Sequence, residues 1–156
     1  MLDASRWRAQ AGNGRCLSLP GTTSEINGQF TTMIVRAPEF RSLQRATTYP
    51  VTLEMVYGVQ FAAIEGLAAR CKRPEARVAY EGALEQLNRA YEHFRAGDDE
   101  LGRLRTVLAR HLFREGALPC NRINEINAAQ GVLQRILARE RDLAAESLAE
   151  PNGKPD

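Results

Sequence analysis

The chain has 156 residues, of which 44% are hydrophobic and 26% charged, and these proportions are typical of one globular domain. Its formal net charge of +2 is too small to indicate a polyanionic partner. Three cysteines at irregular spacing argue against a disulfide framework and favour a reducing compartment. Because no segment resembles a signal peptide or a membrane span, we expect a cytoplasmic, bacterial protein that does not bind a membrane.

The first fifty residues differ in pattern from the rest of the chain. Glycine and small polar residues are frequent there, and Asn27-Gly28 is a turn signal. Residues 29–35 are compatible with a short strand after this turn. A lone hairpin is marginal in water, so we expect residues 1–48 to form a mobile arm or linker. Residues 151–156 are expected to form a frayed tail.

A periodic apolar pattern starts with a predicted helix over residues 51–72. Its apolar residues recur every three or four positions, which is typical of an amphipathic helix. Thr52 suits its N-cap. Arg73-Pro74 ends it, because the residue before a proline is pushed out of helical geometry.

Three more amphipathic helices are predicted after it. The second runs from Pro74 to Gly97, and the third starts at the acidic residues 98–100. A long fourth helix starts at Asn121. Short connections favour antiparallel neighbours, so the sequence predicts an all-α fold, an antiparallel four-helix bundle over residues 49–150 with a flexible N-terminal arm.

Small residues form a strip on the first of these helices. Gly58, Ala62 and Gly66 lie four residues apart, and Phe61 and Glu65 border them. Small residues allow another backbone to approach closely. One interpretation is a surface that binds a protein partner or a second copy and is anchored by Phe61. The other is that this helix is central in the fold and packed on two sides.

Chemistry-bearing residues are sparse. The chain has two histidines, and neither has a second ligand at the spacing that metal sites on helices use. No glycine-rich loop joins a strand to a helix, so a nucleotide site lacks its phosphate cradle. We therefore expect no metal site and no cofactor.

One pair of residues is similar to a known motif. Arg105 and His111, with five residues between them, fit the Arg-x(4–6)-His spacing of HEPN-type helical ribonucleases. The resemblance covers these two residues, and Thr106 stands where that family often has Asn, Asp or His. It implies a catalytic role for Arg105 and His111 on RNA. The alternative is that His111, on the apolar face of its helix, is structural.

The third predicted helix is also basic. Arg103, Arg110 and Arg114 share one of its sides, which predicts an anion-binding face. Aromatic residues that could stack on bases are missing from that side, so nucleic acid is not the favoured partner. The alternative is pairing with the acidic residues of the preceding helix, which are Glu75, Glu81, Glu85 and Glu92.

Together these patterns favour a small non-enzymatic helical interaction protein, such as an adaptor, a regulator or an export chaperone. It is expected to bind a protein partner, or to form a homodimer, through the helix that carries Gly58, Phe61, Ala62, Glu65 and Gly66. The alternative function is a helical protein that acts on nucleic acid, or a ribonuclease, through Arg105 and His111.

Overall fold

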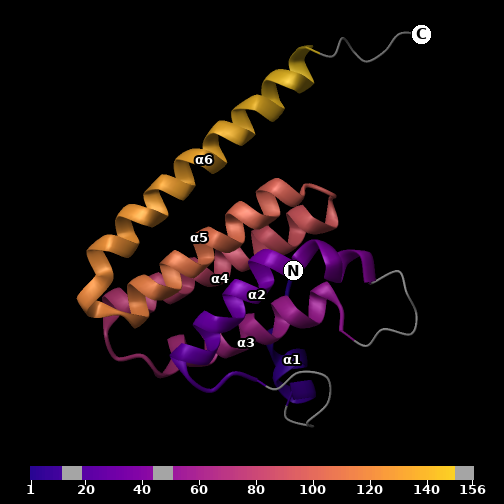
Figure 1. Ribbon diagram of the computed structural model, residues 1–156. Helices are drawn as coiled ribbons and strands as arrows, with labels where there is room; N and C mark the ends of the chain where they lie inside the picture. Colours follow the sequence, from indigo (N-terminus) through magenta and orange to yellow (C-terminus); the bar gives the residue numbers. More distant parts are fainter. Residues whose placement is uncertain (12–18, 44–50, 150–156) are drawn as a thin grey trace.

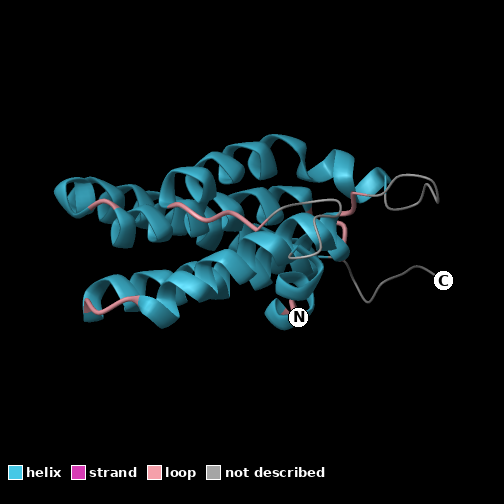
Figure 2. Ribbon diagram, turned by 90° about the horizontal axis from the view of Figure 1, so that it is seen from below, coloured by secondary structure: helices cyan, strands magenta, loops and turns pink. Residues whose placement is uncertain are grey.

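The computed structural model describes residues 1–11, 19–43 and 51–149, and this part of the chain consists of helices and connecting loops without a strand (Figure 2). The α-helices, in chain order, are α1 (Ala4–Ala11), α2 (Thr23–Leu43), α3 (Leu53–Arg70), α4 (Pro74–Arg95), α5 (Asp99–Ala117) and α6 (Arg122–Ala149). A short 3-10 turn, η1 (Pro119–Asn121), connects α5 to α6. The frayed tail expected at residues 151–156 lies outside the described residues.

The all-α prediction is confirmed, whereas the four-helix bundle over residues 49–150 is not. The helices α2, α3, α4 and α5 contact one another in a closed ring, and α1 packs on the outside of α3. The helix α6 packs mainly on α5 and lies at the edge of the molecule (Figure 1). The described chain therefore has six packed helices, and the last one has a single principal neighbour.

The expected boundaries of the central helices are confirmed by their capping contacts. The Thr52 hydroxyl accepts a hydrogen bond from the backbone N–H of Met55 at 3.2 Å, and α4 starts at Pro74. Gly97 has a φ of 92°, a conformation that glycine adopts at little cost, and this ends α4. The carboxylate of Asp98 then accepts from the N–H of Leu101 at 3.0 Å and caps α5.

Residues 1–11 and 19–43 do not form the unstructured arm that was expected. The proposed strand at residues 29–35 lies inside α2, and its prediction is wrong. Five apolar residues of α2 recur at a helical spacing and are buried in the core: Ile26, Phe30, Met33, Ala37 and Phe40. The hydroxyl of Thr22 accepts from the N–H of Glu25 and donates to its carboxylate, which caps α2 at the Thr-x-x-Glu spacing of a capping box, a spacing visible in the sequence. The remaining parts of the expected arm, residues 12–18 and 44–48, lie outside the described residues.

Aromatic side chains fill the centre of the ring of helices. The ring centroid of Phe113 lies 5.9 Å from that of Phe30 and 5.5 Å from that of Tyr80. Tyr57 packs edge-on against Phe94 at 6.0 Å, and its hydroxyl lies 2.8 Å from the Thr106 hydroxyl. Burial raises the pKa of Tyr57 well above its ordinary value, so this hydroxyl stays neutral and serves as a packing group with one hydrogen-bond partner.

A second and smaller core holds α6 on α5. Leu101, Leu104 and Leu108 of α5 pack against Ala129, Val132 and Ile136 of α6. This cluster is separate from the main core, so α6 is attached through one narrow seam.

Candidate functional site

The small-residue strip of α3 is covered by the first helix of the same chain. Gly58 and Ala62 are buried, and the indole of Trp7 on α1 lies directly against Gly58. A Cβ on Gly58 would lie 2.6 Å from Cε2 of that indole and closer still to Cδ1 and Nε1. Close approach of α1 therefore requires glycine at this position, and α1 itself is the helix that uses the strip.

The other residues of this predicted surface also face α1 or the interior. Phe61 is 9% exposed and belongs to the core. The carboxylate of Glu65 accepts from Arg8 of α1 at 2.6 Å, while Gly66 is half-buried and a Cβ there would contact the Arg70 side chain of the same helix. In the folded chain, α3 is thus packed on two sides and offers no open surface along Gly58, Phe61 and Ala62.

Arg105 and His111 do not converge. Arg105 is 5% exposed and donates to Gln86 of α4 at 2.9 Å and to Glu140 of α6 at 3.0 Å. His111 instead contacts Glu125, fifteen residues earlier on α6, which is about 22 Å away along that helix. The two side chains therefore bind α6 at positions fifteen residues apart and do not face a common point within one chain.

His111 belongs to a partly buried polar cluster around Glu125. Its Nδ1 lies 2.8 Å from one carboxylate oxygen of Glu125, and Nε of Arg114 donates to the other at 3.0 Å. Burial raises the pKa of Glu125, but these two hydrogen bonds outweigh it and hold the pKa below its ordinary value. Through these two hydrogen bonds, Glu125 connects the N-terminal part of α6 to the C-terminal part of α5.

This pKa shift makes the attachment of α6 sensitive to acid. The pKa of Glu125 is lower in the folded state than in the unfolded state. The ionised carboxylate therefore stabilises the fold above the ordinary glutamate pKa of about 4.3, and this stabilisation is lost as the pH falls through the pKa of the folded state. We expect Glu125→Gln to lower the melting temperature at pH 7 and to do so progressively less below about pH 4. Melting curves across this pH range measure the effect. Glu81→Gln, which removes an exposed carboxylate from α4, is the control and should change the melting temperature little at any pH.

The three arginines of the predicted anion-binding face have separate neighbours. Nε of Arg103 donates to the carbonyl oxygen of Ile34 on α2 at 3.4 Å, and Arg114 binds Glu125 of α6. Nε of Arg110 is buried without a hydrogen-bond partner in the described part of the chain. Arg103 thus helps to hold α2 against α5, and Arg114 helps to hold α6 against α5. The alternative interpretation, that these arginines pair with the acidic residues of α4, does not describe these contacts of Arg103 and Arg114.

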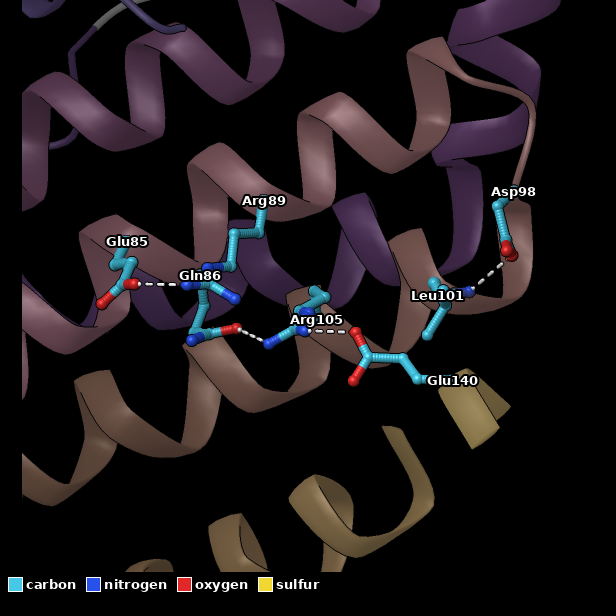
Figure 3. A network of polar contacts seen from close by, with 7 residues as sticks. All are labelled: Glu85, Gln86, Arg89, Asp98, Leu101, Arg105 and Glu140. Carbon is cyan, nitrogen blue, oxygen red and sulfur yellow. Dashed lines mark hydrogen bonds and ion pairs between the residues drawn. The ribbon is translucent and has the colours of Figure 1, made fainter. Parts of the chain in front are cut away.

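A cavity of about 670 Å³ lies between α4 and the C-terminal half of α6. Arg105 lies at its base, where it bridges Gln86 of α4 and Glu140 of α6 (Figure 3). On the α4 wall, Arg89 donates to Glu85 at 2.9 Å. Arg105 is therefore paired with Glu140, and Arg89 is paired with Glu85. Together with Gln86, these residues form a network that joins α4, α5 and α6.

His93 is the titratable group of this cavity with a shifted pKa. It lies on the α4 wall and is half-buried. Burial, followed by the positive charge of Arg105, lowers the pKa of His93, which favours the neutral imidazole. A neutral histidine at this position can both donate and accept a hydrogen bond.

The same side of α6 carries an exposed apolar strip. Glu140 marks the side of α6 that faces the cavity, and Leu133 and Ile126 precede it by seven and fourteen residues, which places them on the same side. Leu137 and Leu148 lie on the adjoining flank. We define the α6 strip as the apolar residues of this side and flank: Ile123, Ile126, Leu133, Leu137, Ala144 and Leu148.

Exposure of the α6 strip is high for large apolar side chains. Leu133 is 37% exposed, Leu137 41%, Ile123 67% and Leu148 86%, whereas Ile126 is half-buried. They are four of the seven large hydrophobic residues that are exposed in the described part of the chain. Scattered apolar residues are normal on a surface, whereas several along one side of a helix indicate an interaction site. The predicted four-helix bundle treated this helix as amphipathic with one buried face, so the exposed strip was not foreseen.

No protein-family model, curated protein or solved structure matches this chain. Within the described residues, no three His, Cys, Asp or Glu side chains lie together in a way that could hold a metal ion. None of the described helices combines the length and the apolar character that crossing a membrane requires.

Proposed function

We propose that the chain is a non-enzymatic helical interaction protein, of the adaptor, regulator or export-chaperone kind, that binds another polypeptide through the α6 strip. One observation carries this proposal: α6 buries one seam against α5 and leaves a second apolar side of the same helix exposed. A helix that is apolar on two sides is normally packed on two sides. A helical segment of a partner, with its apolar side on the α6 strip, would supply the missing neighbour.

The arrangement of the other helices supports the proposal. The closed ring of α2–α5 is a stable platform, and α6 projects from it on a separate seam. The buried network of Arg105 with Gln86 and Glu140 fixes how far α6 stands from α4. The surface is therefore presented by a rigid base, as a binding helix requires.

Photo-crosslinking in the cells that produce the protein tests the proposal. A photoreactive phenylalanine analogue at Leu137 should give adducts of higher mass, because this position lies within the α6 strip. The same analogue at Asn124 is the control, since Asn124 is exposed on the opposite side of α6 and should give none. If neither position gives an adduct, or if both do so equally, the α6 strip is not a binding surface.

A further inference from the structure

The apolar pattern of the α6 strip is symmetric about its middle. Leu133 precedes residue 135 by two positions, and Leu137 follows it by two. Ile126 precedes it by nine and Ala144 follows it by nine. Ile123 and Leu148, at the two ends, lie twelve and thirteen positions away. If a second α6 ran antiparallel with its midpoint level with residue 135, Leu133 would meet Leu137, Ile126 would meet Ala144, and Ile123 would lie within one residue of Leu148 of the second copy.

From this symmetry we infer that the occupant of the α6 strip is a second copy of the chain, and that the two α6 helices pack antiparallel about a two-fold axis that crosses the strip between Leu133 and Leu137, level with residue 135. The inference rests on the proposed function and names its partner. A two-fold interface uses the same patch on both subunits, so the patch has to be complementary to itself. Leu133 of each copy then packs on Leu137 of the other.

The charges along the α6 strip fit the same alignment. Arg141 is exposed at the outer edge of the strip and lies within one residue of the level of Gln130 of the second copy, so no like charges meet there. The carboxylate of Glu140 is held by Arg105 of its own chain and needs no partner from the second copy. The remaining charged residues of the exposed part of α6, which include Arg135, Asp142 and Glu146, lie on the side away from the strip.

The size of the contact sets the expected strength. From Ile123 to Leu148 the strip is about 38 Å long, and with a helix diameter of about 10 Å its footprint is about 380 Å² per chain. Stable interfaces bury about 800 Å² per partner. The footprint is about half of that, so we expect a weak, reversible dimer that forms as the protein concentration rises and dissociates on dilution.

Sedimentation velocity over a dilution series tests the dimer. The parent chain should change from the mass of one chain to that of two, and Leu137→Glu should raise the dimer dissociation constant at least tenfold. Leu137 is already 41% exposed, so the monomer should keep its helical circular dichroism and its melting temperature. Asn124→Glu adds the same charge on the opposite side of α6 and should leave the dissociation constant unchanged. A parent chain that stays monomeric throughout, or a dimer that tolerates Leu137→Glu, overturns the inference.

Disulfide trapping tests the antiparallel alignment. Two variants are made in a chain whose three native cysteines are changed to serine, one with Gln130→Cys and one with Arg141→Cys. In the antiparallel dimer these two thiols would face each other at the edge of the α6 strip. The mixture of the two variants should form a cross-linked dimer, whereas each variant alone should not. In this alignment the two copies of residue 130 are separated by about 15 Å along the helix, and the two copies of residue 141 by about 18 Å. A disulfide needs Cα atoms within about 7 Å, so neither variant can cross-link to itself. Cross-linking of each variant with itself, and none in the mixture, overturns the antiparallel arrangement.

The two proposals fail in different ways. If the chain is monomeric in solution but position 137 cross-links to another protein in cells, the second copy is the wrong occupant and the interaction function stands. If the chain is monomeric and position 137 gives no adduct, both proposals are wrong.

Discussion

Phe30→Ala is expected to lower the free energy of unfolding by about 3–5 kcal/mol, as is typical of a large-to-small change at a buried aromatic. Phe30 is 0% exposed, and its ring packs on Phe113 of α5. Removing the ring would leave a cavity between α2 and α5 that their rigid neighbours fill only in part. Urea unfolding followed by circular dichroism measures the change.

The neighbouring residue provides a matched control for this experiment. Thr31 is exposed on the opposite side of α2, so Thr31→Ala should change the free energy of unfolding by no more than about 0.5 kcal/mol. If Phe30→Ala costs no more than Thr31→Ala, then α2 does not belong to the core, and the expectation of a mobile segment at residues 19–43 returns.

The helix boundaries after residue 50 could be predicted because single residues determine them. Thr52 caps α3, Pro74 starts α4, and Gly97 ends it, and each acts through local backbone chemistry that the sequence displays directly. The helix α2 was missed because Asn27-Gly28 resembles a turn and Thr31 and Thr32 interrupt the apolar run. Its periodic apolar residues and its capping box outweigh these signals once α3 and α5 provide a surface to pack on.

Which helix covers which face could not be predicted. An amphipathic pattern shows that a face will be buried, but it does not identify the neighbour that buries it. The strip around Gly58 was therefore compatible with an external partner, although α1 occupies it. For α6 the opposite happened. Its apolar residues predicted a helix packed inside a bundle, whereas in the structure one apolar side of α6 is exposed.

The divergence of Arg105 and His111 follows from helix geometry alone. Six residues at about 100° each put the two side chains about 120° apart around α5. One then faces the α4 side and the other faces the N-terminal part of α6. Two residues six positions apart on one straight helix therefore do not line one site on its surface.

Trp7→Ala is expected to cost about 3–5 kcal/mol of folding free energy, because Trp7 is 2% exposed and joins α1 to α3. Gly58→Ala should weaken the same contact from the other side, since its new methyl group overlaps the indole and forces α1 outward. We expect a cost of about 1–3 kcal/mol from this overlap, even though alanine favours a helix by about 1 kcal/mol over glycine. Trp7 is the one tryptophan in the chain, so its fluorescence emission should shift to the red in Gly58→Ala as α1 separates from α3.

The double variant decides whether the indole is the cause. The three atoms nearest a Cβ on Gly58 all belong to Trp7, so Gly58→Ala in the Trp7→Ala background has lost its main clash. There it should become neutral or stabilise the fold by up to about 1 kcal/mol, which reverses the sign of its effect. Urea unfolding of the four proteins of this cycle gives the coupling energy between the two positions. An equal cost of Gly58→Ala in both backgrounds would mean that α1 does not rest on the small-residue strip, and that the strip is open to a partner after all.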